Sequence, residues 1–331
     1  MAFKICLIGC GGMAVNGHGP MLKKYAAMRH GVELAACCDI SSERAASFAA
    51  AFGFNQAFTD MDAMLDTVKP DGVVLAVPIE LTARLAVEIL KRRIPLLTEK
   101  PPGISLDEGN AIVTAANVSG VPVSAAFNRR TMPLVEALVK EIDAVGKPID
   151  SITIEMCRVN RTDPDFSMTA IHDVDLARFL CRSDYSSADF SYHVHEAAAP
   201  AADICMMAVM ESGATVNLGF YPMCGSATER VTVRLHGHLF QADLPIYGSA
   251  DLPGRIVHIA GNSVVNTIIG EEYCDQAEAN GFLGEHASFF DAVREGRIPQ
   301  HSVEGSLQSL ALASCISNRA MHYKKDKGDK K

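Results

Sequence analysis

Lys100 stands in a context that suits catalysis. It lies in the segment Thr98–Pro102, directly after an apolar run that predicts a strand. Ligands bind at the carboxyl edge of a parallel sheet, so an ammonium group there could polarise a carbonyl or hold a hydroxyl oxygen. A proline-bounded surface turn with a solvated lysine is the plainer alternative, and the Lys100–Pro101 bond could be cis.

His172 is the second candidate for proton chemistry. It lies near the start of a predicted amphipathic helix at Ala170–Cys181, with Asp175 three residues further on the same face. An imidazole titrates near neutrality and can exchange a proton with a substrate oxygen. A capping or core histidine is the alternative. A metal triad with Asp173 and Asp175 is disfavoured because Asp173 points off the shared face, and we expect no metal.

A nucleotide-binding turn is predicted at the N-terminus. The pattern Gly9-x-Gly11-x-x-Ala14 follows a strand-like apolar run and precedes a helical pattern. Gly9 allows the tight turn, and Gly11 lets the backbone approach a pyrophosphate. Ala14 permits close packing of helix on strand, while the helix N-terminus faces the anion. A purely structural glycine turn is the alternative.

Asp39 ends the second predicted strand and should accept hydrogen bonds from the adenosine ribose. It follows Ala14 by 25 residues, more than the usual spacing of about 20. We attribute the excess to Asn16–Pro20, which cannot be regular helix and resembles an insertion. A carboxylate repels a 2′-phosphate, so NAD(H) is favoured over NADP(H). Arg44, one helical turn further on, only weakens this preference.

The first part of the chain alternates short apolar runs with helical patterns, which predicts βαβ units and a parallel sheet. Ser105 and Glu108 form a capping box for a helix that runs to about Val118. The predicted strands are Phe3–Gly9, Val32–Asp39, Gly72–Val77, Pro95–Thr98 and Val121–Ala125.

Beyond about Phe127 the pattern becomes one of alternating apolar and polar residues. Asp150–Val159 alternates, and turn signals fall at Glu211–Ala214 and His236–His238. Such alternation is typical of an antiparallel sheet with one face on a core. The helices expected to cover that face are Met132–Ala144, Ala170–Cys181, Glu285–Glu295 and Ser302–His322.

These patterns predict an α/β chain with two domains. We expect a Rossmann doubly wound parallel sheet at residues 1–126 and an α+β domain with a large open, mainly antiparallel sheet at 127–323. The lysine-rich segment 324–331 is expected to be a disordered charged tail. A length of 331 residues fits two domains better than one.

Composition narrows the class of partner. The chain is 48% hydrophobic and 21% charged, as in ordinary globular proteins, and has no long uncharged run that could span a membrane. The net charge of −9 disfavours nucleic acid and anionic membranes. Met1–Gly12 reads as a strand and not as a signal peptide. Ten scattered cysteines without a C-x-x-C pair favour reduced thiols in the cytoplasm.

Several motifs together resemble the Gfo/Idh/MocA oxidoreductase family, which includes glucose–fructose oxidoreductase and inositol dehydrogenases. In chain order they are the turn at Gly9–Ala14, Pro78 after a strand, the tripeptide Glu99–Pro101, His172-Asp-x-Asp, and the closing stretch Phe289–Pro299. The resemblance spans most of the chain.

The resemblance implies that Lys100 and His172 are the catalytic pair. His172 would take the hydroxyl proton while C4 of the nicotinamide accepts hydride, and Lys100 would position the oxygen. It also implies a homodimer or homotetramer formed through the exposed face of the second sheet. The implied cofactor contacts are Gly9, Gly11, Gly12, Met13, Ala14, Asp39, Val77, Pro78, Glu99, Lys100 and Asn128. We expect the substrate contacts to be Lys100, Arg129, Arg158, Met168 and His172.

Two positions depart from the family pattern. Sugar-oxidising relatives usually place Asp or Asn four residues before the catalytic histidine, where this chain has Met168. The family often has a histidine four residues after the strand-end proline, where this chain has Thr82. Met168 cannot hydrogen-bond a sugar hydroxyl as a carboxylate would, which argues against a standard polyol substrate.

We therefore expect an NAD(H)-dependent dehydrogenase or reductase that interconverts a hydroxyl and a carbonyl on a sugar, polyol or derivative. A nucleotide-sensing binding protein that has lost the chemistry is one alternative, favoured by Met168 and Thr82. An enzyme that keeps NAD(P) tightly bound and cycles hydride internally is another.

Overall fold

The computed structural model describes residues 2–163, 165–272 and 275–325. The chain divides into two compact units. The first, here called the Rossmann unit, comprises Met1–Asn128 and Gly281–Leu310, and the second, the sheet unit, comprises Arg129–Asn280 and Ala311–Lys331. The expected boundary near residue 127 is close to the break after Asn128. The second domain was expected to be one continuous segment, but in the structure the chain returns to the Rossmann unit at Gly281.

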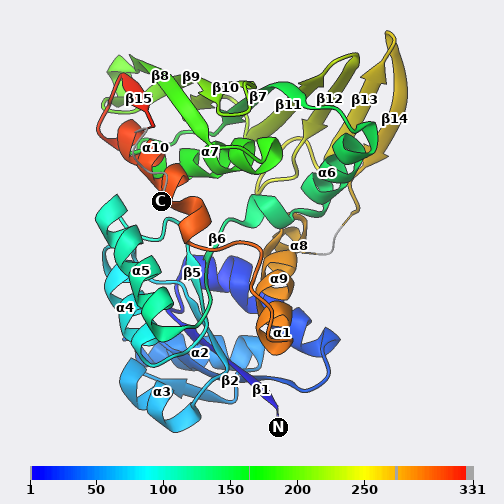
Figure 1. Cartoon of the computed structure of the whole chain (residues 1–331). Coiled ribbons are helices and arrows are strands. Elements are labelled where there is room, and N and C mark those ends of the chain that lie inside the picture. Colours follow the sequence, from blue (N-terminus) through cyan, green and yellow to red (C-terminus); the bar gives the residue numbers. More distant parts are fainter. Residues whose placement is uncertain (1, 164, 273–274, 326–331) are drawn as a thin grey trace. The chain divides into compact units, whose positions relative to one another are not determined.

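The Rossmann unit is built on a six-stranded parallel sheet of order β3-β2-β1-β4-β5-β6 (Figure 1). The strand order reverses between β1 and β4, and the carboxyl ends of these strands form the crevice where ligands bind in such sheets. The strands are β1 (Phe3–Ile8), β2 (Val32–Cys38), β3 (Gln56–Phe58), β4 (Gly72–Leu75), β5 (Leu96–Glu99) and β6 (Val123–Ala126). The doubly wound parallel sheet is therefore confirmed, with β3 as an addition too short to carry a sequence pattern.

Helices cover both faces of this sheet. Side chains from α1, α2 and α9 join Ile5 and Leu7 in one buried cluster, with Tyr25, Phe48 and Phe290 at its centre. On the opposite face α4 and α5 lie side by side (Figure 1). The helices are α1 (Gly19–Met28), α2 (Ser42–Phe52), α3 (Met61–Val68), α4 (Ile79–Lys91), α5 (Leu106–Ser119) and α9 (Phe282–Arg294). Ser105 caps α5 as expected, since its Oγ accepts a hydrogen bond from the Glu108 amide at 3.3 Å.

The segment expected to be an irregular insertion is helical. Ala14–His18 forms one π-helical turn, η1, that runs directly into α1. A π-turn accommodates an extra residue without ending the helix. The longer spacing to Asp39 is therefore absorbed within the helix, and the turn buries His18 completely.

The sheet unit contains nine strands in the order β14-β13-β12-β11-β7-β10-β9-β8-β15. Neighbouring strands are antiparallel except for the central pair β7 and β10, which is parallel. The predicted turns at Glu211–Ala214 and His236–His238 connect β9 to β10 and β11 to β12. The strands are β7 (Ile149–Cys157), β8 (Tyr185–Val194), β9 (Ala202–Met210), β10 (Thr215–Tyr221), β11 (Thr228–Leu235), β12 (His238–Asp243), β13 (Arg255–Ala260), β14 (Ser263–Ile269) and β15 (His322–Lys324).

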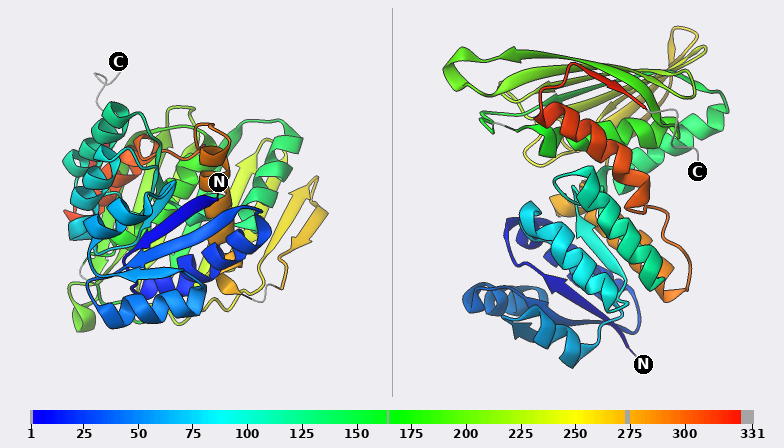
Figure 2. Two further views of the ribbon diagram at one scale, coloured as in Figure 1. Left: turned by 90° about the horizontal axis from the view of Figure 1, so that it is seen from below. Right: turned by 60° about the vertical axis from the view of Figure 1, so that its left-hand side comes forward.

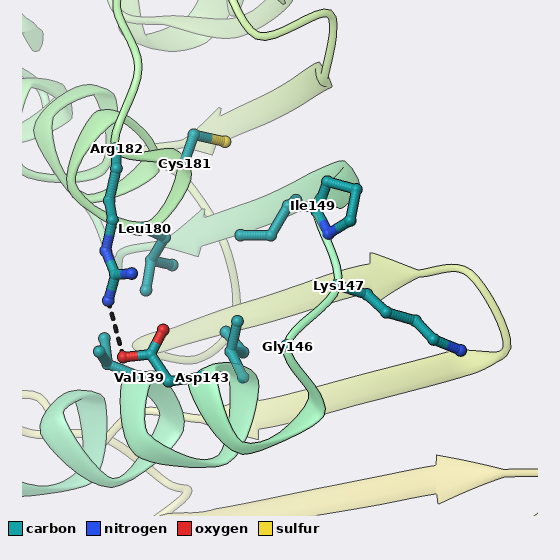
Figure 3. A pocket seen from close by; sticks show the side chains of 10 residues that line it. Val139, Asp143, Gly146, Lys147, Ile149, Leu180, Cys181 and Arg182 are labelled. Atoms are coloured by element: carbon teal, nitrogen blue, oxygen red, sulfur yellow. Dashed lines mark hydrogen bonds and ion pairs between the residues drawn. The ribbon is translucent and has the colours of Figure 1, made fainter.

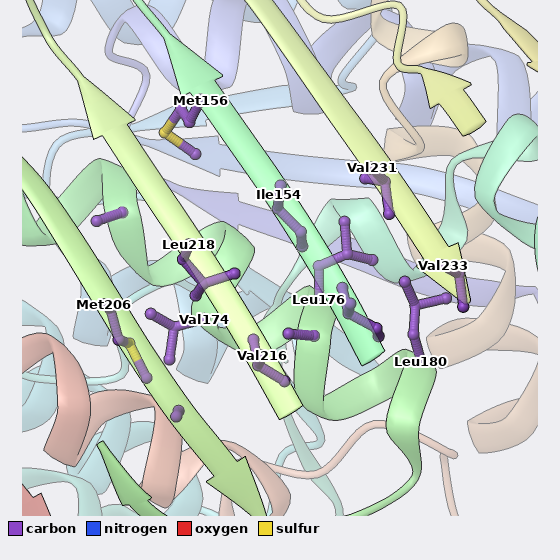
Figure 4. Packing of buried hydrophobic residues seen from close by; sticks show 14 of the residues in the cluster. Ile154, Met156, Val174, Leu176, Leu180, Met206, Val216, Leu218, Val231 and Val233 are labelled. Carbon is purple, nitrogen blue, oxygen red and sulfur yellow. The ribbon is translucent and has the colours of Figure 1, made fainter. Parts of the chain in front are cut away.

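One face of this sheet is covered by helices (Figure 2). Helix α7 lies over its centre, where Val174 and Leu176 pack against Ile154 and Leu218 (Figure 4). The helices of the unit are α6 (Pro133–Val145), α7 (Ser167–Cys181), α8 (Gln276–Ala279) and α10 (Leu307–Ser317), the last of which begins in the Rossmann unit. The apolar side of α7 thus fixes the part of the chain that carries His172.

Three sequence expectations need correction. The helix expected at Glu285–Glu295 is α9, which packs in the Rossmann unit because Phe289 and Phe290 join that unit's core. The helix expected at Ser302–His322 is shorter, since α10 ends at Ser317 and Arg319 takes a left-handed conformation (φ 53°). The chain then pairs with β8 as strand β15, so Lys324 lies in a strand instead of a tail. Residues 326–331 lie outside the described part of the chain.

Candidate nucleotide-binding and active site

The glycine turn after β1 has the geometry of a nucleotide-binding loop. Gly9 adopts φ 92°, and a Cβ there would lie 2.2 Å from the Ala76 carbonyl oxygen, so only glycine fits. At Gly11 and Gly12 a Cβ would meet no described atom within 4 Å. The backbone at these two residues therefore faces open space at the start of the η1–α1 helix, where the helix dipole favours an anion.

A pocket of about 460 Å³ adjoins this turn. Residues of the turn and of η1 line one side, and residues of α2, among them Phe48 and Phe52, line the other. It is lined by Cys10, Gly11, Gly12, Val15, Asn16, Arg44, Ser47, Phe48, Ala51 and Phe52. Amide donors beside an apolar wall match the two halves of a dinucleotide, a charged pyrophosphate and a flat adenosine, so the residues present fit the group.

Asp39, directly after β2, braces the glycine turn. Its Oδ2 accepts a hydrogen bond from the Cys10 amide at 2.9 Å, and Oδ1 accepts one from the Ser41 amide at 2.9 Å. Arg44 Nη2 donates to Oδ1 at 2.7 Å. Burial acts to raise the pKa of Asp39, but the bonds from Arg44, Ser41 and Cys10 outweigh it and hold the pKa below its ordinary value. The carboxylate is therefore ionised.

The contact with Arg44 differs from the sequence expectation, which left Arg44 a helical turn away. Helix α2 starts only three residues after Asp39, at Ser42, so its first turn brings Arg44 back over the strand end. Asp39 Oδ2 accepts one hydrogen bond from the described residues, that of the Cys10 amide. It therefore keeps a lone pair that can accept a hydrogen bond from a ribose hydroxyl.

Lys100 follows the last residue of β5, as expected, and the Lys100–Pro101 peptide is cis. Glu99 orients this strand end through both carboxylate oxygens. Oε2 accepts the Lys100 amide at 3.0 Å, and Oε1 pairs with His18 Nε2 at 2.9 Å. Burial acts to raise the pKa of Glu99, but the hydrogen bond and charge of His18 hold it below its ordinary value.

The other Rossmann-unit residues expected in the site lie at neighbouring strand ends. Val77 follows β4 and its Cγ1 lies 3.0 Å from the Cβ position of Gly9, so it packs on the turn. Pro78 is the N-cap residue of α4, and buried Thr82 donates its hydroxyl to the Pro78 carbonyl at 3.4 Å. Asn128 is buried at the end of the unit.

In the sheet unit, His172 lies in α7 beside two fully buried carboxyl groups. Asp175 binds Arg130 through bonds of 2.7 Å and 2.5 Å. Burial raises the pKa of Asp173 well above its ordinary value, and the charge of Glu229 adds to this.

Glu229 is the centre of a buried ion-pair cluster that the sequence analysis missed. Arg129 donates to its two oxygens at 2.9 Å and 3.0 Å, and Arg158 also binds it. Burial acts to raise the pKa of Glu229, but the two arginines lower it to about 2. Arg129 and Arg158, expected to bind substrate, are thus engaged inside the unit. Met168, the other substrate candidate, lies half-buried in the first turn of α7.

A second pocket, of about 250 Å³, lies at the C-terminal ends of α6 and α7 (Figure 3). Its walls are largely apolar, and Arg182 pairs with Asp143 across its mouth at 2.8 Å. Cys181 in its wall is nine residues along α7 from His172, a rise of roughly 13 Å. The pocket includes none of the candidate catalytic or cofactor residues.

Together, the switch-point glycine turn, the ionised carboxylate after β2 and the flanking pocket define a dinucleotide-binding Rossmann domain. Residues 3–127 match the model of the Gfo/Idh/MocA family, described as an oxidoreductase family with an NAD-binding Rossmann fold. The match covers the first part of the chain, which therefore resembles the NAD-binding domain of this family.

The chain is similar to D-apiose dehydrogenase of Paraburkholderia graminis, at 30% identity over 148 residues that cover 44% of this chain and 38% of that protein. It is also similar to inositol 2-dehydrogenase of Rubrobacter xylanophilus, at 29% identity over 191 residues and 52% of each chain. The aligned regions thus span about half or less of these relatives.

A solved dehydrogenase structure from Chromobacterium violaceum superposes with a TM-score of 0.83 at 20% identity, covering 96% of this chain and 95% of that one. This likeness shows the fold of the whole chain. Among the described residues no helix has the length and apolar character needed to cross a bilayer.

Proposed function

We propose that the protein is an NAD-dependent dehydrogenase that interconverts a hydroxyl and a carbonyl group on a small polar substrate. The observation that carries this proposal is the presence, in one parallel sheet, of a complete nucleotide turn after β1 and a lysine fixed at the end of β5. Gly11 and Gly12 leave their side of the turn open, while Glu99 holds the Lys100 amide at 3.0 Å.

The bound nicotinamide would supply a hydride acceptor at C4. Lys100 would hold the substrate oxygen, and its ammonium would stabilise the negative charge that develops on that oxygen. His172 would take the hydroxyl proton as the carbonyl forms. Lys100 and His172 belong to different units, so the meeting of the two side chains at one substrate is part of the proposal.

The buried cluster around Glu229 supports the role of His172. Asp173 is the next residue in α7, and it is packed with Glu229 of β11, which in turn binds Arg129 and Arg158. These groups anchor one turn of α7 to the sheet. Arg129 and Arg158 would therefore position His172 indirectly. Met168 would lie nearer to the substrate than these two arginines.

The proposed substrate class is a sugar, polyol or derivative. Its support is the names of the relatives, a D-apiose dehydrogenase and an inositol 2-dehydrogenase. Met168 replaces the acidic or amide residue expected before the histidine, so we propose a substrate that offers an apolar group or no hydroxyl at that point.

NAD is the proposed cofactor. Asp39 is ionised and would repel a 2′-phosphate, although Arg44 offsets part of its charge. The described buried thiols, such as Cys6 and Cys38, are free, which fits the cytoplasmic location that we propose.

We further propose a homodimer or homotetramer formed through the outer face of the second sheet. Met207 and Val209 on β9 are 66% and 42% exposed on that face, and Val264 on β14 is 61% exposed. Exposed apolar side chains of this kind mark association surfaces. Light scattering coupled to gel filtration would test the assembly, with Met207→Lys expected to shift it toward monomer.

The test of the main proposal is NAD reduction screened across inositols, aldoses and sugar acids. We expect turnover with at least one of them, lost in Lys100→Ala and His172→Ala. The exposed residues Lys91 and His30 provide matched alanine controls that should retain activity. NAD binding without turnover would instead support the nucleotide-sensing alternative, and nicotinamide that co-purifies with the chain would support internal hydride cycling.

A further inference from the structure

A cluster of metal-ligating side chains lies inside the Rossmann unit, between the π-turn η1 and helix α9. It consists of His18, Glu285 and His286, which come from opposite ends of the unit's sequence. One donor atom of each lies within 4.8 Å of the others, and His18 Nδ1 is 2.9 Å from His286 Nε2. The histidines are fully buried and Glu285 is 6% exposed.

The contacts that Glu285 makes with described residues do not explain why its carboxyl group is buried. Among the described residues, no group donates a hydrogen bond to either oxygen of Glu285. His286 Nδ1 likewise has no hydrogen-bond partner among these residues. A buried carboxyl group without a partner is costly, so its retention calls for a partner from outside the chain.

Glu99 prepares His18 to act as a ligand. Its Oε1 accepts from His18 Nε2 at 2.9 Å, which directs the Nδ1 lone pair toward His286 and Glu285. A carboxylate on the second nitrogen is the usual support of a metal-bound histidine, since it fixes the tautomer and ring orientation. Glu99 is itself held by the Lys100 amide.

The surroundings are apolar and rigid. The Phe282 ring meets His18 edge-on, with centroids 5.2 Å apart and planes at 90°. A Cβ on Gly17 would lie 2.6 Å from that same ring, so η1 and α9 are in close contact. An apolar wall of this kind excludes bulk water and strengthens the attraction between a cation and its ligands.

We propose that His18, Glu285 and His286 bind a divalent transition-metal ion of the zinc class, with Glu99 as the hydrogen-bond partner of His18. Two imidazoles and a carboxylate favour zinc or ferrous iron, whereas magnesium and calcium prefer oxygen ligands alone. Zinc–nitrogen bonds of about 2.0–2.1 Å in a tetrahedral site put donor atoms roughly 3.3 Å apart. The two histidines need to separate by only a few tenths of an ångström to reach that spacing.

The bound ion would join the nucleotide turn to α9. His18 is four residues beyond Ala14, and His286 is on the segment that returns from the sheet unit. A bond between them closes a loop of more than two hundred residues, and such closures stabilise a fold by restricting the unfolded chain. The inference is independent of the proposed reaction.

The test is zinc and cobalt binding to untagged, chelator-treated protein, measured by elemental analysis and by the visible spectrum of Co²⁺. We expect about one ion per chain, a tetrahedral Co²⁺ spectrum, and a thermal midpoint that rises with zinc concentration. Glu285→Gln and His286→Ala should weaken binding by more than about tenfold. The glutamine variant keeps the volume of Glu285, so it should remain folded.

His195, which pairs with Asp203 in the sheet unit, provides a control against binding at other histidines. His195→Ala should leave one ion per chain. Far less than one ion bound to the wild-type chain would overturn the proposal. So would unchanged affinity in Glu285→Gln, provided that its circular dichroism matches the wild type.

Discussion

Alanine substitutions at Gly9 and Gly11 should separate folding from cofactor binding. Gly9 has φ 92°, and its Cβ would overlap the Ala76 oxygen at 2.2 Å. The left-handed backbone costs about 1–2 kcal/mol for an alanine, and the overlap costs about 1–3 kcal/mol more. We therefore expect Gly9→Ala to lower the free energy of unfolding by about 2–5 kcal/mol, which is a large share of a typical stability of about 5–15 kcal/mol.

Gly11→Ala should behave in the opposite way. Its backbone is not left-handed and its Cβ would meet no described atom within 4 Å, so the unliganded chain accommodates alanine without strain. Its stability should stay the same or rise by about 0.4–1 kcal/mol, because alanine restricts the unfolded chain. The added methyl would occupy the space where the pyrophosphate approaches the backbone, and an overlap of about 1–3 kcal/mol weakens binding roughly fivefold to a hundredfold.

Thermal unfolding and calorimetric titration with NAD and NADH would measure both effects. At about 2–4 °C per kcal/mol, the thermal midpoint of Gly9→Ala should fall by roughly 4–20 °C. The reasoning fails if Gly11→Ala binds NAD(H) as tightly as the wild type, because the cofactor would then not lie against this turn. It also fails if Gly9→Ala is as stable as Gly11→Ala.

The remaining predictions concern four further parts of the site. Lys100→Ala should lower kcat by about a hundredfold to ten-thousandfold with little change in NAD affinity, and a parallel loss of NAD affinity would point to a structural role. His172→Ala should lower kcat by a similar factor and remove a pH dependence near neutrality, which pH–rate profiles would measure. Asp39→Asn should weaken NAD binding by about tenfold and narrow the preference for NAD over NADP, whereas Arg44→Ala should widen that preference. An equal ratio of NAD affinity to NADP affinity in the wild type and both variants would contradict the role of Asp39 in cofactor choice. Asp173 has a raised pKa in the folded state and so takes up a proton on folding above its ordinary pKa of 3.8, which means that stability falls as pH rises toward the raised pKa. Asp173→Asn should therefore gain stability relative to the wild type as the pH rises above 3.8 in urea unfolding, and stability curves that run parallel with pH in the two proteins would refute the raised pKa of Asp173.

Much of the nucleotide site was predictable because it depends on local sequence. Gly9 and Gly11 follow a short apolar run, and Lys100 follows another, so both fall at the carboxyl edge of a parallel sheet. Strand ends are fixed by nearby residues, and the sheet order then follows from the right-handed crossovers of βαβ units.

The π-turn and the chain's return to the Rossmann unit were not predictable in this way. Gly17 and Pro20 argue locally against a helix, yet packing of Phe282 on Gly17 stabilises one. Likewise, α9 is amphipathic and the pattern does not say which sheet it covers. Its place depends on contacts of Phe290 with Tyr25, more than 250 residues earlier.

Glu229 was missed although the sequence carries a signal for it. In Thr228–Leu235 it shares its side of the strand with Val231, Val233 and Leu235, so alternation places a carboxylate facing the core. A buried acid needs a cationic partner, which would have assigned Arg129 and Arg158 to it.

The most direct test of the central claim follows a labelled hydrogen. NAD and an inositol or aldose carrying deuterium on carbon would be incubated with the wild-type chain, and mass spectrometry would locate the label. We predict deuterium in the reduced nicotinamide, with the rate reduced at least about a hundredfold in Lys100→Ala and unchanged in Lys91→Ala. The claim is contradicted if the chain binds NAD but no polyol, aldose or sugar acid passes its label to the cofactor.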